Sequence, residues 1–174
     1  WDDIDVVINA AAWTNVDGAE TPEGRRATWQ ANSTGPAVLA REATAHGVTM
    51  VHISTEYVFD GTQDVHLEDE APSPLGAYGQ SKAGGDAAVA STPKHYIVRT
   101  SWVVGDGKNF LKTMASLADQ GISPSVVSDQ VGRLTFTSDL ARGIIHLLTT
   151  GAEFGTYNLS GEGPVMSWAQ VAKR

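Results

Sequence analysis

The chain has 174 residues, no cysteine, and a formal net charge of −8 from 12 basic and 20 acidic side chains. This length fits a single domain of about 100–200 residues, and the absence of cysteine excludes disulfides, thiolate nucleophiles and cysteine-ligated metal centres. The acidic balance argues against a nucleic-acid partner, because phosphate backbones bind basic surfaces. No apolar run approaches the roughly 18 residues of a membrane span, so the sequence predicts a cytoplasmic protein without a membrane partner.

Short β-branched runs alternate with longer alanine- and leucine-rich segments along the whole chain. Residues 4–9 are nearly all apolar, which predicts a strand buried on both faces of a parallel sheet. Thr21 before Pro22 predicts the start of a helix. The expected elements are strand 4–9, helix 21–47 with a kink or restart at Gly35-Pro36, strand 48–53, loop 54–76, helix 77–91, strand 95–100, helix 109–120, strand 125–127, a helix from Thr137 or Ser138, strand 155–159 and a helix from Ser167.

This alternation of strands and helices is typical of βαβ units, so we expect an α/β fold with a parallel, doubly wound sheet. In such sheets ligands bind beyond the carboxyl ends of the strands. The loops that follow Asn9, Ile53 and Thr100 are therefore the places where we expect the functional site.

The first two of these loops carry small and hydroxyl side chains. Ala10, Ala11 and Ala12 would let a flat ligand approach the backbone closely, or they would simply allow tight packing. Ser54 and Thr55 end the second strand, where a hydroxyl could bind a substrate oxygen. The alternative is that both hydroxyls satisfy nearby backbone groups.

Tyr78 and Lys82 are four residues apart on the helix expected from residue 77, and therefore share a face. An ammonium group near a phenol favours the phenolate and lowers its pKa from about 10, which makes the phenol a useful general acid or base. Trp102 follows the third strand and is either an apolar platform for a sugar ring or a core aromatic residue.

Together these residues resemble the extended short-chain dehydrogenase/reductase family, and within it the branch that reduces 4-keto dTDP-sugars. The resemblance covers essentially the whole chain, because several ordered motifs have the spacing of the family. The matching blocks are Val-Ile-Asn-Ala-Ala-Ala at 7–12, Val-His-Ile-Ser-Thr-Glu-Tyr-Val-Phe-Asp-Gly at 51–61, Pro-Leu-Gly-Ala-Tyr-Gly-Gln-Ser-Lys at 74–82, Arg-Thr-Ser-Trp-Val at 99–103, Gly-Lys-Asn-Phe-Leu-Lys-Thr-Met at 107–114, Asp-Gln-Val-Gly at 129–132 and Leu-Ser-Gly at 159–161.

The resemblance implies a catalytic trio of Thr55, Tyr78 and Lys82. The implied reaction reduces the C4 keto group of dTDP-4-dehydro-L-rhamnose, with hydride from NADPH or NADH and a proton from Tyr78. By the same resemblance, Lys82 holds the nicotinamide ribose and depresses the pKa of Tyr78, while Thr55 stabilises the developing charge on the C4 oxygen.

The remaining site residues are also implied by the resemblance. Ala10, Ala11 and Ala12 match a stretch that lines the cofactor, together with Tyr78 and Lys82. The residues matched to sugar contacts are Thr55, Glu56, Tyr57 and Trp102.

The chain departs from the family pattern in several places. Glu56 stands where the family usually has Asp, and Arg133-Leu134 follow a motif that usually continues with a small residue and Pro. A glutamate associated with magnesium in some members would fall near Ser138, so we predict no metal site. Lys108, Lys112 and Arg133 are either counter-charges for the substrate diphosphate or ordinary surface cations.

The glycine-rich phosphate-binding turn of a dinucleotide fold has no counterpart ahead of Ile4. We therefore expect residues 1–174 to form one partial NAD(P)-binding domain, a truncated Rossmann-like sheet with part of a small substrate-binding region. The strand at 4–9 would then have an open edge, which could pair with a second copy of the chain as a homodimer.

Two other functions remain open, and a third is disfavoured. Sugar-nucleotide dehydratases place an Asp-Glu pair just after the Thr, whereas here Glu56 is followed by Tyr57, which favours simple reduction over elimination. Another sugar-nucleotide reductase or epimerase would share most of the motifs. The family also resembles the regulatory subunit of methionine adenosyltransferase, which uses the same fold for binding without catalysis.

Overall fold

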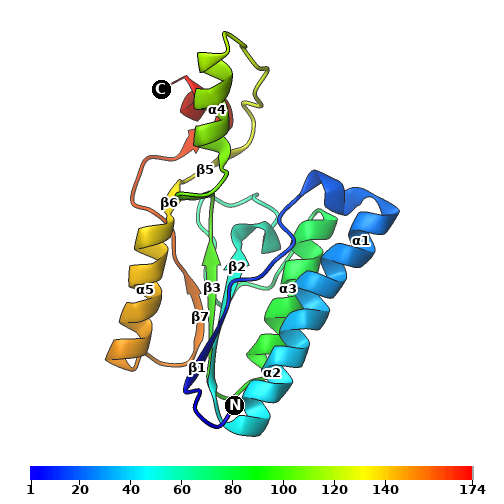
Figure 1. Ribbon diagram of the computed structural model, residues 1–174, viewed down its shortest axis with the longest axis vertical. Coiled ribbons are helices and arrows are strands. Elements are labelled where there is room, and N and C mark those ends of the chain that lie inside the picture. Colours follow the sequence, from blue (N-terminus) through cyan, green and yellow to red (C-terminus); the bar gives the residue numbers. More distant parts are fainter. Residues whose placement is uncertain (174) are drawn as a thin grey trace. The chain divides into compact units, whose positions relative to one another are not determined.

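The computed structural model describes residues 1–173, which form two compact units. Unit 1 comprises Trp1–Arg99 and Gly151–Asn158, and unit 2 comprises Thr100–Thr150 and the chain from Leu159 onward. Figure 1 labels most of the helices and strands of both units.

Unit 1 is built on a four-stranded sheet with the order β1-β2-β3-β7. β1 pairs with β2, and β3 with β7, in parallel. The α/β fold with a parallel sheet is thus confirmed. The strands are β1 (Val6–Asn9), β2 (Thr49–Thr55), β3 (His95–Thr100) and β7 (Gly155–Asn158).

Three helices cover one face of this sheet: α1 (Pro22–Trp29), α2 (Gly35–His46) and α3 (Ala77–Ala90). The Thr21 hydroxyl accepts a hydrogen bond from Gly24 N at 3.0 Å and so caps α1, as its sequence predicts. The predicted restart at Gly35-Pro36 is also confirmed, because a π turn over Gln30–Thr34 ends there and α2 begins. Short 3-10 turns cover Asp17–Glu20 and Glu56–Val58.

The core of unit 1 lies between this helical layer and the sheet. Small side chains on α2 allow close packing against the longer side chains of β2 and β3. The buried members are Ala40, Ala43, Val48, Met50, Val89 and Ile97, with Val7 and Leu39 packed at the margin.

The prediction that the first strand is buried on both faces is wrong for these residues. Side chains alternate along a strand; Val7 joins the core and Asn9 is buried, whereas Val6 and Ile8 are 36% and 51% exposed. β1 is also an end strand of the described sheet. Pairing of this edge with a second copy stays a prediction.

Unit 2 contains α4 (Phe110–Asp119), α5 (Thr137–Thr150) and α6 (Trp168–Ala172). Two short ladders join β4 (Val103–Val104) to β6 (Thr135–Phe136) in parallel and β5 (Val131–Gly132) to β8 (Met166–Ser167) in antiparallel fashion.

The strand predicted over 125–127 is wrong. Residues 125–127 form neither a helix nor a strand, and the carbonyl of Val127 accepts a single backbone bond from Ala169 N at 3.0 Å. Ser and Pro flank this β-branched pair, and so short a run has little sheet preference without a partner strand. In neither unit is a helix of the described chain long and apolar enough to cross a bilayer.

Candidate active site

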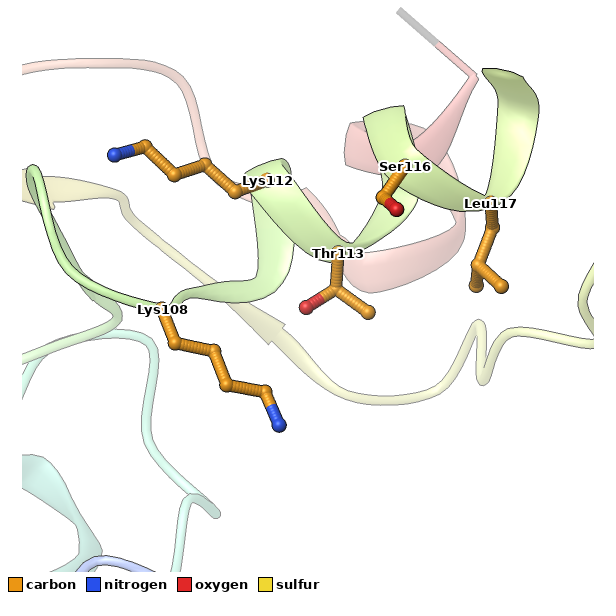
Figure 2. A pocket seen from close by; sticks show the side chains of 5 residues that line it. All are labelled: Lys108, Lys112, Thr113, Ser116 and Leu117. Carbon is orange, nitrogen blue, oxygen red and sulfur yellow. The ribbon is translucent and has the colours of Figure 1, made fainter. Parts of the chain in front are cut away.

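The basic side chains considered as counter-charges do not converge on one point. Lys108 and Lys112 line a cavity of about 320 Å³ at the start of α4, with Thr113, Ser116 and Leu117. Figure 2 shows their ammonium groups pointing apart. Lys112 Nζ donates to the Asp106 carbonyl, and Arg133 donates to the Gly163 carbonyl. This arrangement favours the interpretation of Lys112 and Arg133 as surface cations.

Trp102 lies in unit 2, in an aromatic cluster with Trp168 and Phe110. Its ring stacks on Trp168 with centroids 3.5 Å apart, and Trp168 also contacts Phe110 at 4.4 Å. Gly132 packs over the face of the Trp102 indole, where an added Cβ would lie 2.7 Å from Cε2, 2.9 Å from Nε1 and 3.0 Å from Cζ2. Trp102 has a φ of 38°, a conformation that is strained for a bulky residue. Trp168 and Gly132 therefore both pack against the Trp102 ring and fix its position.

The other candidate residues lie in unit 1, where β2 ends at Thr55. The Thr55 hydroxyl accepts a hydrogen bond from Tyr57 N at 3.2 Å and donates to Glu56 Oε2 at 3.2 Å. Burial raises the pKa of the Glu56 carboxyl to about 7, although the hydrogen bond from Thr55 opposes the rise. The strand end thus places a hydroxyl beside a carboxyl group that is easily protonated near neutral pH.

Tyr78 occupies the first turn of α3 and faces this strand end. Its ring meets the Tyr57 ring edge-on, with centroids 5.8 Å apart. α3 approaches closely because Gly79 has no side chain; a Cβ there would lie 2.1 Å from the Tyr57 carbonyl oxygen. The predicted helix containing both Tyr78 and Lys82 is confirmed.

The expected lowering of the Tyr78 pKa is wrong in this structure. Burial, followed by the Glu56 charge, raises the pKa of Tyr78 to about 12, with only the Thr55 hydroxyl acting against it. The Lys82 ammonium donates instead to the Ile53 carbonyl at 2.6 Å. Tyr78 is therefore fully protonated at neutral pH.

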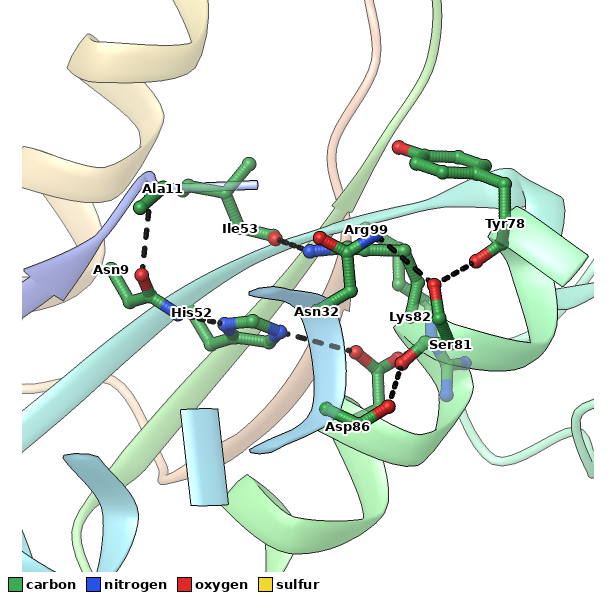
Figure 3. A network of polar contacts seen from close by, with 11 residues as sticks. Asn9, Ala11, Asn32, His52, Ile53, Tyr78, Ser81, Lys82, Asp86 and Arg99 are labelled. Atoms are coloured by element: carbon green, nitrogen blue, oxygen red, sulfur yellow. Dashed lines mark hydrogen bonds and ion pairs between the residues drawn. The ribbon is translucent and has the colours of Figure 1, made fainter. Parts of the chain in front are cut away.

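Lys82 is almost completely buried, with 2% of its surface exposed. Burial lowers its pKa to about 8, and the nearby Asp86 carboxylate acts in the opposite direction. Figure 3 shows the ammonium reaching from α3 to the last residues of β2. A charged group is thus held at the carboxyl end of the sheet, where a ligand is expected to bind.

The loop after β1 is joined to α3 by Asn32, a residue that the sequence analysis missed. Asn32 is fully buried in the π turn; its Oδ1 accepts from Trp13 N at 2.8 Å, and its Nδ2 donates to Trp13 O and Ser81 Oγ, both at 3.0 Å. Ser81 Oγ then donates to the Tyr78 carbonyl at 2.6 Å (Figure 3). A π turn has no clear signature in a single sequence, so no pattern indicated this role.

This junction provides a stability test. Replacing Asn32 by Ala leaves the Trp13 N–H and carbonyl groups without their partner, and we expect a loss of about 1–2 kcal/mol in the free energy of unfolding. Urea unfolding followed by circular dichroism measures it. Asn15→Ala, which removes the exposed bond from Gly18 N, is the control and should lose less. Equal losses of unfolding free energy in the two variants would contradict the role of Asn32 as a bridge between the loop after β1 and α3.

Ala10, Ala11 and Ala12 leave the carboxyl end of β1 with exposed side chains. Asn9 Oδ1 accepts a hydrogen bond from Ala11 N at 3.3 Å and so fixes the start of this loop. Exposed methyl groups on an anchored backbone offer a close approach to a flat ring, which fits a nicotinamide cofactor. In residues 1–173, no cluster of three or more His, Asp or Glu side chains has the spacing to hold a metal ion.

Comparison with known proteins shows the family to which this chain belongs. The family profile described as the RmlD substrate binding domain matches residues 2–174. A dTDP-4-dehydrorhamnose reductase of Sinorhizobium fredii is 39% identical, over 97% of this chain and 59% of the relative. That of Salmonella typhimurium is 43% identical, over 97% and 58%.

Solved structures agree with these matches. The dTDP-4-dehydrorhamnose reductase of Bacillus anthracis, crystallised in complex with NADP, superposes with a TM-score of 0.91 at 38% identity, over 97% of this chain and 60% of that one. The chain thus spans about three-fifths of the length of the relatives it matches. By its sequence and its fold, the chain belongs to the RmlD substrate binding domain family, and its relatives include sugar-nucleotide reductases.

Proposed function

We propose that the protein reduces the C4 keto group of dTDP-4-dehydro-L-rhamnose to give dTDP-L-rhamnose, with NADPH or NADH as the reductant. The observation that carries this proposal is the gathering of Thr55, Tyr78 and Lys82 around the carboxyl end of β2. The proposal is also supported by sequence identity, because this chain is 39% and 43% identical to two dTDP-4-dehydrorhamnose reductases.

Each residue of the trio has a role that its surroundings allow. Tyr78, protonated because its pKa is raised, donates a proton to the C4 oxygen. The Thr55 hydroxyl turns from Glu56 to the same oxygen and stabilises its developing charge. Lys82 binds the ribose hydroxyls next to the nicotinamide. The bound nicotinamide supplies the hydride.

The remaining proposed contacts, to the cofactor and to the sugar, follow from where their residues lie in the chain. Ala10, Ala11 and Ala12 let the cofactor approach the end of β1. Glu56 and Tyr57 contact the sugar, and Trp102 stays a proposed sugar contact on its motif position alone. An elimination is disfavoured, because Tyr57 stands where a dehydratase needs its second carboxylate.

A rate assay on the full-length protein tests the proposal. We expect NADPH or NADH to be oxidised when dTDP-4-dehydro-L-rhamnose is added. The loss of absorbance of the reduced nicotinamide measures this oxidation. The control is dTDP-glucose, which has no keto group and should give no change. Absence of turnover in a folded protein that binds both ligands would reject the reductase function and favour a non-catalytic regulatory role.

A further inference from the structure

A buried carboxylate lies one helical turn beyond Lys82. Asp86 is 4% exposed, and its Oδ2 accepts a hydrogen bond from Arg99 Nε at 3.2 Å. Its Oδ1 lies 3.7 Å from His52 Nε2 on β2. Figure 3 shows this carboxyl group on α3, facing the His52 ring of the sheet.

The neutral form of His52 follows from its hydrogen bonds. The Ala11 N–H binds Asn9 Oδ1, which orients the Asn9 amide, and Asn9 Nδ2 then donates to His52 Nδ1 at 3.0 Å. The ring proton is therefore on Nε2, the atom that faces Asp86. Burial lowers the pKa of His52 to about 3, so His52 offers a dipole to Asp86 rather than a charge.

Arg99 is the permanent cation beside Asp86, but other contacts also hold it. Its Nη1 donates to the Glu68 carbonyl at 3.2 Å, and its guanidinium lies over the Phe59 ring, 5.0 Å from the centroid. The groups that face Asp86 are thus His52 and Ser54 from β2, Arg99 from β3 and Lys82 from its own helix.

We propose that Asp86 is a positioning residue of the reductase site, whose buried carboxylate acts through Lys82 and keeps its ammonium protonated. Burial disfavours a charged lysine, and the Ile53 carbonyl satisfies only one of its three N–H groups. Asp86, four residues later on the same helix face, supplies the opposite charge. The effect on turnover rests on the proposed function, whereas the effect on Lys82 does not.

The test compares Asp86→Asn with Asp86→Glu and with Glu42→Gln, a surface control on α2 that also removes one negative charge. The ¹³Cε resonance of Lys82, assigned with Lys82→Arg, reports its pKa in the full-length protein. We expect Asp86→Asn to lower that pKa by about one unit, and the basic limb of the kcat/KM profile to move to lower pH by the same amount. Asp86→Glu should restore both, and Glu42→Gln should change neither.

The unmutated protein provides a second measurement, which counts even if Asp86→Asn does not fold. The Lys82 resonance should show a small second step at acid pH, when Asp86 takes up its proton. Absence of that step, or an unchanged Lys82 pKa in folded Asp86→Asn, would overturn the proposal and leave Asp86 a purely structural residue. A shifted pKa in a protein without reductase activity would uphold the electrostatic role and reject the proposed function instead.

Discussion

Replacing Tyr78 by Phe is expected to lower kcat for sugar-nucleotide reduction by about 10³-fold, within the usual range for loss of a general acid. Phe keeps the ring that packs edge-on against Tyr57 but has no proton to give to the C4 oxygen. Steady-state rates of the full-length protein with saturating substrates measure the effect.

Measuring how well the Tyr78→Phe variant binds both ligands shows whether a low rate comes from the missing proton donor or from a damaged fold. Tyr78→Phe should bind NADPH and the sugar nucleotide nearly as well as the unmutated protein, and its thermal unfolding should be unchanged. A kcat within twofold of the unmutated value would remove Tyr78 as the proton donor. Glu56 would then be the next candidate, because burial raises its pKa to about 7.

Replacing Gly85 by Ala is expected to destabilise unit 1 by about 3 kcal/mol, near the upper end for an overpacked core. In an exposed helix this exchange would be favourable by about 1 kcal/mol. Here the added Cβ would lie 2.2 Å from the Asn32 carbonyl oxygen in the π turn. α3 would have to move away, and it carries Tyr78, Lys82 and Asp86 with it.

Gly107→Ala is the control, because a Cβ at this position would have no neighbouring atom within 4 Å and its φ is not positive. Urea unfolding of both variants gives the comparison, and Gly107→Ala should be close to neutral. If Gly85→Ala were as stable as its control, the close approach of α3 to the π turn would be wrong.

Much of the fold of unit 1 was predictable, because buried parallel strands are short β-branched runs such as residues 95–100. The strands of unit 2 were not, since Val131–Gly132 and Met166–Ser167 are two residues each. So short a segment has no periodicity, and only the partner strand decides its conformation.

For the site, the spacing of Tyr78 and Lys82 was enough to place both on one helix. Asp86 was missed, although it follows Lys82 at the same spacing and could have been found from it. The raised pKa of Tyr78 was not, because it results from burial and from Glu56, both of which depend on how α3 packs. Asn32 was hidden for a similar reason, since its bonds reach Trp13 and Ser81 only in the folded chain.

The π turn over Gln30–Thr34 joins α1 to α2. Because of it, the number of residues in this helical segment matters more than which residues they are. A π turn is wider than an α turn by one residue, which corresponds to a rotation of about 100° between the segments on either side. Asn32 can therefore face α3 while Ala40 and Ala43 still face the sheet. For protein engineering, this segment tolerates exchange of exposed side chains, but a one-residue deletion would restore a regular helix and put these two faces out of phase.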